Sequence, residues 1–331
     1  MSYQPTDLAV FLPQVVSDSP TNGGVTTREV VASGVMNGIF PDVTSDERAN
    51  GSTKYRKMIF KPNVRTISPL YECYLVCTKF SNRDVAMGFA YGTEDDTQAT
   101  AASKQYYVMA KVVAKNGSGV LLDSSCQPLI ENGTQTYRVF SQATQTTFTV
   151  RSTGWALTSG RVQITLSQED RDKISLNDTL CADKMFNLSS LDTPTALTPQ
   201  VHSYTKNSAN GTVVEDMITY PAGALRSTVT LTFTSSETYN AVIDAAGTTK
   251  SGNINSTTTL YHPDGISQTA NDIMLEIPPS VFSGTWAAGD TLQVTVESGA
   301  VPVWLKRIIP AGTSDTSGAL EIGASLLFIT S

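Results

Sequence analysis

The chain has 331 residues, of which 40% are apolar and only 16% charged, and its formal net charge is −7. This balance excludes a disordered chain and a coiled coil, and the abundance of Thr, Ser and Gly favours strands and turns over helices. The acidic balance also argues against nucleic-acid binding, which needs a basic face to neutralise phosphates.

Residues 1–24 are rich in Pro, Asp and Ser and contain one apolar patch, 8–12. Two interpretations are open. The segment is either an extended arm that docks on a neighbouring subunit through Leu8 and Phe11, or the first strand of the core. The start lacks the basic segment of a signal peptide, and no run of about 18 apolar residues predicts a membrane span.

Residues 25–190 are predicted to form a β-rich domain, because runs of alternating polar and apolar residues are separated by Asn-Gly turns. Alternation is clearest in 161–166. The predicted strands are 28–40, 54–61, 70–80, 85–91, 105–114, 136–140, 147–151 and 161–166.

One short helix is expected near 45–50. Thr44 and Glu47 have the spacing of a capping box, in which each side chain satisfies a backbone N–H of the other residue. Asn50-Gly51 then supplies a stop signal. A second short helical piece is expected at 168–173.

Two charged runs in this region have alternative interpretations. Lys54-Tyr55-Arg56-Lys57 is either a solvated strand face or protein contact, or a small nucleic-acid patch; the first is favoured because the run is short. Glu94-Asp95-Asp96 is either a solvated loop or a Ca²⁺ site, and it lacks the spaced oxygen ligands of a known calcium loop.

The sequence contains no recognisable catalytic or metal motif. Its two histidines, His202 and His262, fall in a predicted linker and a predicted turn, without partners at metal-ligand spacing. Cys73 and Cys77 lie about 13 Å apart on one predicted strand, too far to bridge each other, which favours buried free thiols. We therefore expect no catalytic residues, no cofactor and no metal.

The stretch 191–211 is rich in Thr, Pro, Ser and Asn and is predicted to be a linker. Strand patterns resume in 212–331, with strict alternation in 227–233 and 292–296. Several short strands with frequent turns predict a C-terminal β-sandwich domain of immunoglobulin-like kind. Overall, the fold class expected is all-β, with two β-sandwich domains, short helical connectors and an extended N-terminal arm.

Near the C-terminus the sequence reads Gly-Thr-Trp-Ala-Ala-Gly-Asp over 284–290, and Pro-Val-Trp-Leu-Lys-Arg-Ile-Ile-Pro-Ala-Gly-Thr over 302–313. Near the N-terminus, 34–57 contains Gly-Val-Met-Asn, Phe-Pro-Asp-Val, Asp-Glu-Arg and Tyr-Arg-Lys. This set of motifs resembles a family of structural proteins from tailed-bacteriophage virions, with motifs of the form GTWAAGD, PxWxKRxxPAGT and YRK. The last residues, 319–331, depart from the ending that is typical of the family.

The resemblance implies a virion component, assembled in the bacterial host cytoplasm, and not an enzyme. It leaves the position in the particle open between the tail, the neck (collar), the baseplate and a decoration on the head, of which the tail or neck is favoured. Its partners would be other copies of itself, in a symmetric ring or array, and other virion proteins, without nucleic acid or membrane. Pro302 and Pro310 bracket a strand, which suits an edge position that pairs with another chain. The candidate inter-subunit contacts are Leu8, Phe11, Arg56, Trp304, Lys306 and Arg307. The alternative is a receptor- or glycan-binding phage module.

Overall fold

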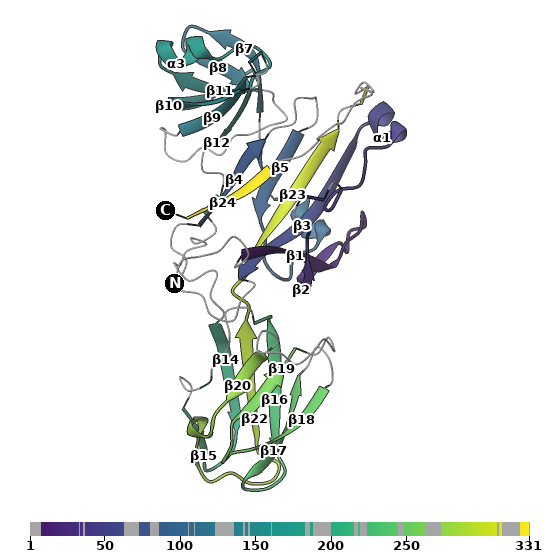
Figure 1. Cartoon of the computed structure of the whole chain (residues 1–331), viewed down its shortest axis with the longest axis vertical. Coiled ribbons are helices and arrows are strands. Elements are labelled where there is room, and N and C mark those ends of the chain that lie inside the picture. The colour runs from purple at the N-terminus through teal and green to yellow at the C-terminus, as the bar shows by residue number, and fades with distance from the viewer. Residues whose placement is uncertain are drawn as a thin grey trace.

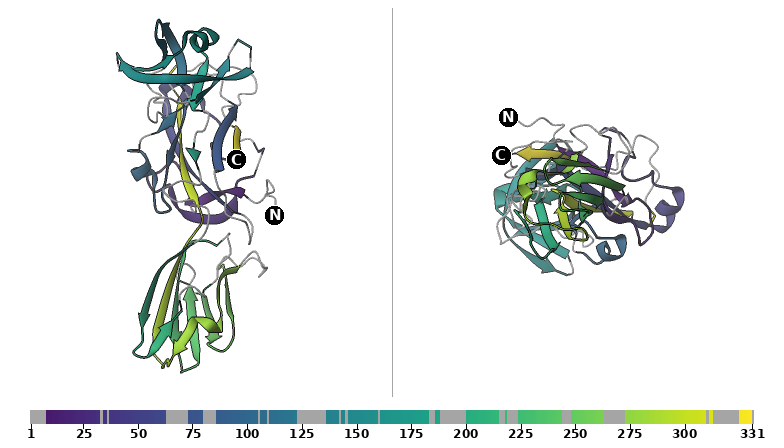
Figure 2. Two further views of the ribbon diagram at one scale, coloured as in Figure 1. Left: turned by 90° about the vertical axis from the view of Figure 1, so that its left-hand side faces the viewer. Right: turned by 90° about the horizontal axis from the view of Figure 1, so that it is seen from below.

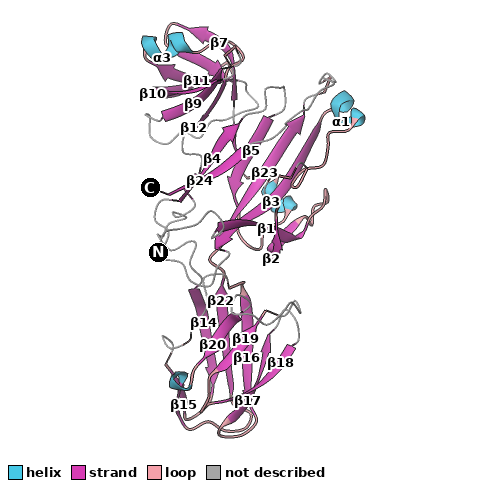
Figure 3. Cartoon of the chain, viewed as in Figure 1, coloured by secondary structure: helices cyan, strands magenta, loops and turns pink. Residues whose placement is uncertain are grey.

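The computed structural model describes most of the chain. The described residues are 8–62 without 33 and 36, 73–79, 86–122 without 105 and 109, 136–182 without 142, 145 and 160, 186–187, 200–214, 218, 224–243, 248–262, 273–309, 311–312 and 325–330. Strands dominate, and the α-helices in this part of the chain are short (Figure 3). The prediction of an all-β fold is confirmed.

The molecule is elongated and consists of three parts that follow one another along its long axis (Figure 1). A barrel occupies one end, a six-stranded sheet the middle, and a C-terminal sandwich the other end. The perpendicular view in Figure 2 has the same order.

The middle sheet joins segments from both ends of the chain. Its order is β2-β1-β3-β23-β5-β6, and all of its pairs are antiparallel. The strands are β1 (Leu8–Val15), β2 (Gly23–Val30), β3 (Ser52–Pro62), β5 (Ala86–Tyr91), β6 (Tyr107–Val108) and β23 (Val301–Ile309). A separate sheet has the order β13-β4-β24, from β4 (Cys73–Lys79), β13 (Phe186–Asn187) and β24 (Ser325–Thr330).

The barrel is closed, in the order β10-β11-β8-β7-β12-β9. Its core is formed by inward side chains such as Val120, Val139 and Ile164, which are fully buried. The strands are β7 (Ala110–Asn116), β8 (Gly119–Leu122), β9 (Thr136–Ser141), β10 (Thr146–Thr158), β11 (Arg161–Leu166) and β12 (Thr179–Ala182).

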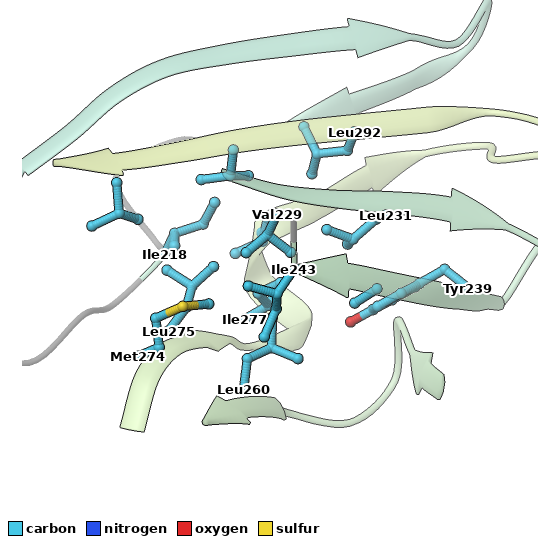
Figure 4. Close-up of a cluster of buried hydrophobic side chains, with 14 of the residues drawn as sticks. Ile218, Val229, Leu231, Tyr239, Ile243, Leu260, Met274, Leu275, Ile277 and Leu292 are labelled. Carbon is cyan, nitrogen blue, oxygen red and sulfur yellow. The ribbon is translucent and has the colours of Figure 1, made fainter. Parts of the chain in front are cut away.

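The C-terminal part packs a five-stranded sheet, β14-β22-β16-β17-β18, against two short strand pairs, β19-β20 and β15-β21. Figure 4 shows the apolar side chains that meet between them, with Leu231 and Leu292 on one side and Leu260 and Ile277 on the other. The strands are β14 (Gln200–Asn207), β15 (Gly211–Val213), β16 (Ser227–Phe233), β17 (Thr238–Ile243), β18 (Thr248–Asn253), β19 (Thr258–Tyr261), β20 (Ile273–Ile277), β21 (Phe282–Gly284) and β22 (Thr291–Glu297).

Short helices connect the strands. Helix α1 (Ser45–Asn50) has the capping box predicted from Thr44 and Glu47. Helix α3 (Gln168–Lys173) lies at the predicted position, with Ser167 as its N-cap. A single helical turn, α2 (Gln98–Ala101), follows the acidic triplet, and a 3-10 turn, η3 (Pro279–Val281), precedes β21.

Three predicted boundaries need correction. For residues 1–24, the structure agrees with the interpretation as a first strand of the core, because β1 pairs with β3 inside the middle sheet. The predicted linker 191–211 contains β14, because Val201 and Tyr204 pair along β22 despite the turn-rich composition; residues 191–199 lie outside the described residues. The predicted domain 212–331 is interrupted, since β23 leaves the sandwich and enters the middle sheet.

The strand predicted at 28–40 is also wrong over most of its length. β2 ends at Val30, and the glycines and Asn37 that follow form turns. Asn37 has φ 62° and Gly34 has φ 76°, a left-handed conformation that interrupts a strand.

Candidate functional site

The residues predicted to contact other subunits lie in the middle sheet, and most are covered by their own chain. Phe11, Arg56, Trp304 and Arg307 are all buried. The edge position predicted for the strand of Trp304 and Arg307 is wrong, because β23 is a central strand between β3 and β5. Lys306 is half-buried, and the backbone of Leu8 pairs with Pro62; the side chain of Leu8 lies outside the described residues.

Pro302 has no backbone N–H, and its position in β23 explains why a central strand tolerates it. Its carbonyl accepts from Gly92 N at 2.8 Å, so the side of the strand that lacks an N–H faces the end of β5. The β5 pairing begins only one residue later, with Val303 opposite Tyr91. The only hydrogen bond that the proline forgoes is the reciprocal one to Gly92, beyond the end of β5, so the proline does not mark an edge.

One face of the sheet carries a buried cluster of charges. The register places Arg307 opposite Lys54 and Leu305 opposite Arg56, so the three cationic side chains share a face. Arg56 Nη1 lies 2.6 Å from Asp18 Oδ1, and Lys54 Nζ lies 3.0 Å from both Asp18 Oδ2 and Glu47 Oε1. These pairs attach the segment after β1 and helix α1 to the sheet.

Phe40 covers the same cluster. The guanidinium carbons of Arg307 and Arg56 lie 4.8 and 5.5 Å from the centre of its ring, within cation–π range. Arg307 Nη1 donates to Pro41 O at 2.8 Å. The Phe-Pro segment of the N-terminal motif is thus held by an arginine of the C-terminal motif.

Glu47 links the helix cap to this cluster. Its Oε2 accepts from Thr44 N at 2.8 Å, and its Oε1 accepts from Ser52 and meets Lys54. Burial alone would raise the pKa of Glu47, but the Thr44 and Lys54 hydrogen bonds outweigh it and lower the pKa to about 2. The carboxylate is therefore charged at any physiological pH.

The opposite face of the sheet contains a buried ammonium. Lys57 Nζ donates to three backbone carbonyls, Gly24 O at 2.8 Å, Glu94 O at 2.8 Å and Asp96 O at 3.2 Å. Burial lowers the pKa of Lys57 to about 8, against the neighbouring Asp96 and Glu94 carboxylates that raise it. The side chain joins the β2 start and the acidic triplet to β3.

A glycine and a tryptophan complete this arrangement. Gly23 has φ 117°, and a Cβ at this position would lie 2.5 Å from Asp96 O and 3.0 Å from the Trp304 ring. Trp304 is itself fully buried, with Lys57 Nζ 5.9 Å from its ring centre. Trp304 therefore acts as a packing residue of the sheet.

The acidic triplet forms a structural junction, in which Asp96 is buried and Asp95 is exposed. Asp96 accepts from Thr93 N and Oγ1 at 2.8 and 2.7 Å and pairs with Lys104 at 2.8 Å. Asp95 Oδ2 lies 2.6 Å from Arg226 Nη1, and Glu94 Oε1 accepts from Ser298 at 2.8 Å. Asp95 and Glu94 thus connect the middle sheet to the C-terminal sandwich.

Exposed apolar side chains lie elsewhere, on β10 of the barrel. Trp155 and Leu157 are exposed although they lie opposite the core residues Ile164 and Val162. Sequence reasoning missed them because the strand predicted at 147–151 stops too early. The signal was present: Trp155, Leu157 and Val162 flank a Ser-Gly turn in the pattern of a hairpin.

Within the described residues, no three His, Cys, Asp or Glu side chains are placed to hold a metal ion. His262, which was predicted to lie in a turn, is buried directly after β19. No helix in the described ranges is both long and apolar enough to cross a bilayer. Comparisons with protein-family models, with curated proteins and with solved structures found no match.

Proposed function

We propose that this chain is a structural component of a tailed-bacteriophage virion, in the tail, neck or baseplate region, that acts by subunit assembly and has no enzymatic activity. One observation carries the proposal. The two motif segments on which the resemblance rests, 54–57 and 302–309, lie far apart in the sequence and are neighbouring strands, with Trp304 opposite Lys57 and Lys306 opposite Tyr55.

This pairing gives the motif residues a physical role that needs no ligand. Arg56, Lys57, Trp304 and Arg307 are buried and tie segments of the chain to one sheet. A sequence pattern that encodes a strand pairing and its covering loops is expected of a building block. It is not expected of an active site, where polar groups converge on a cleft.

The proposal is tested in particles purified from the phage that encodes the chain. Quantitative mass spectrometry of these particles should find the chain at a fixed ratio to the other virion proteins, in many copies per particle. Its absence from the particles, or a ratio that varies between preparations and falls on further purification, would overturn the proposal.

A glycan-binding module is the second candidate, and Trp155 favours it, because exposed tryptophans supply stacking faces for sugar rings. Binding to a glycan array that is abolished by Trp155→Ala, with the fold unchanged by circular dichroism, would support this function. The absence of binding at millimolar oligosaccharide would eliminate it.

A further inference from the structure

The joint between the sandwich and the middle sheet is short. Residues 298–300 separate the end of β22 in the sandwich from the start of β23 in the middle sheet. Ser298 Oγ donates to Glu94 Oε1 at 2.8 Å, and Arg226 Nη1 of the sandwich lies 2.6 Å from Asp95 Oδ2. Both contacts reach neighbouring residues of the acidic triplet, so the way in which the triplet is held affects where the sandwich lies.

The triplet has no helix or strand to give it a fixed shape. Glu94 and Asp95 form a turn between β5 and α2, and the side chain of Asp95 is 70% exposed, so packing does not fix its position. Lys57 Nζ donates to the carbonyls of Glu94 and Asp96, at 2.8 and 3.2 Å, which flank the middle residue of the triplet. The lysine therefore fixes the backbone from which the Asp95 carboxylate reaches Arg226.

The ammonium of Lys57 is itself held in place by the sheet. Its strand, β3, lies between β1 and β23, its side chain is buried, and the residue opposite it is Trp304. Its third bond goes to Gly24 O at 2.8 Å, and Gly24 N donates to Asp96 O at 3.0 Å. The lysine and the start of β2 therefore hold the carbonyl of Asp96 together.

Other contacts of this loop tie its ends or close it on itself. Gly92 N donates to a carbonyl of β23 at one end, and Gln98 N donates to the residue before β2 at the other, at 2.8 and 2.7 Å. The Asp96 carboxylate accepts from Thr93 and pairs with Lys104, both of which are close to it in the sequence. Among the described contacts, the bonds to the buried ammonium and to β2 are the ones that attach the backbone at the middle of the loop to the sheet.

We propose that Lys57 is a positioning residue that sets the orientation of the sandwich relative to the middle sheet, although none of its described contacts is with the sandwich. Glu94 has a second attachment, since its Oε1 also accepts from Thr26 of β2. The effect of Lys57 is therefore transmitted mainly through Asp95 and Arg226. A tilt of about 10° at the joint would move the far end of a seven-residue strand such as β22, about 24 Å long, by about 4 Å. This inference concerns the chain alone and does not depend on the proposed function.

Distances between two labels on the full chain test this role. Spin labels attached through unnatural amino acids at the exposed positions 46 and 237, in α1 and in the β16–β17 turn, leave the four native cysteines untouched. The wild type should give one narrow distance by pulsed electron paramagnetic resonance. Arg226→Ala and Lys57→Met should each replace it by a broad distribution. The control Lys306→Met, which changes a lysine of the adjacent strand β23, should keep the narrow distance.

The double variant distinguishes a positioning role from a general loss of stability. If Lys57 acts through Asp95 and Arg226, adding Lys57→Met to Arg226→Ala should broaden the distribution no further, and a broader distribution would overturn the inference. A Lys57→Met protein that is folded by circular dichroism and keeps the wild-type distance would also overturn it, as would equal broadening in Lys306→Met. Should Lys57→Met not fold, Lys57→Gln, which keeps a donor on a shorter side chain, is judged by the same criteria.

Discussion

Buried cationic side chains hold separate segments of this chain to the middle sheet. Arg56 donates to Ser17 O at 2.9 Å, Arg307 to Pro41 O, and Lys57 to carbonyls of the β2 start and the acidic triplet. Each cation donates to backbone carbonyls of a segment that covers the sheet. The positive charges of the motifs thus act within the molecule.

At Lys57 this role predicts a large loss of stability on substitution. Lys57→Met keeps the length of the side chain but removes the ammonium from three carbonyl oxygens, of which Asp96 O retains a hydrogen bond from Gly24 N. The expected cost is about 2–4 kcal/mol in the free energy of unfolding. Lys306→Met is the control. Within the described residues, its ammonium contacts the rings of Tyr106 and Tyr55, so the cost should be under about 1 kcal/mol. Equal costs in urea unfolding would contradict this role.

The lowered pKa of Glu47 predicts how the free energy of unfolding changes at acid pH. Its folded pKa of about 2 lies below the usual 4.5, so its contribution is present above about pH 4.5 and is lost as the pH falls towards 2. Glu47→Gln should lower the free energy of unfolding at pH 7 by about 1–3 kcal/mol. The difference between variant and wild type should shrink steadily between pH 5 and pH 2, measured by denaturant titration; a constant difference would refute this assignment.

At the scale of elements, β23 is the strand on which the middle part depends. It lies between β3 and β5 and contributes Val303, Trp304 and Leu305 to the buried interior. The strand comes from the end of the chain, so the middle sheet is complete only after the sandwich has been synthesised. The sandwich has its own apolar cluster and does not need β23.

Two truncations isolate this strand. A chain that ends at residue 299 should keep a protease-resistant C-terminal sandwich from about residue 200, while its middle part is digested. A chain that ends at residue 312 retains β23 and should protect the middle sheet as well. Protection of the middle part in both truncations would contradict a central role for β23. Limited proteolysis with mass spectrometry of the fragments makes the comparison.

Local elements could be predicted from the sequence, whereas their long-range pairing could not. β11 and β16 lie at the predicted residues because alternation is a property of neighbouring residues, and the capping box of α1 spans four residues. The partner of β23 is about 250 positions away, and no local pattern specifies it. The proline that suggested an edge is tolerated because β5 ends beside it.

At the scale of the whole molecule, an ion pair joins the middle part to the sandwich. Arg226 of the sandwich pairs with Asp95 of the middle part at 2.6 Å and, within the sandwich, with Glu297 at 3.2 Å, and about a third of its side chain is exposed. Exposed ion pairs stabilise a fold by under about 1 kcal/mol and weaken in salt. The contact is therefore suited to fixing an orientation between the two parts, and contributes little to the stability of either.

Arg226→Ala should accordingly leave the unfolding free energy within about 1 kcal/mol of the wild type. The same variant should broaden the distribution of overall dimensions in small-angle scattering, and high salt should have this effect on the wild type. Lys250→Ala, a sandwich cation on the edge strand β18, serves as the control and should change neither quantity. A large drop in stability without a change in scattering would show that Arg226 supports the sandwich itself.

A cryo-EM map of the assembled phage particle tests most directly the claim that this chain is an assembly unit. The account predicts elongated three-part densities at a symmetric position in the tail, neck or baseplate. A particle whose map and protein content lack the chain would contradict the claim.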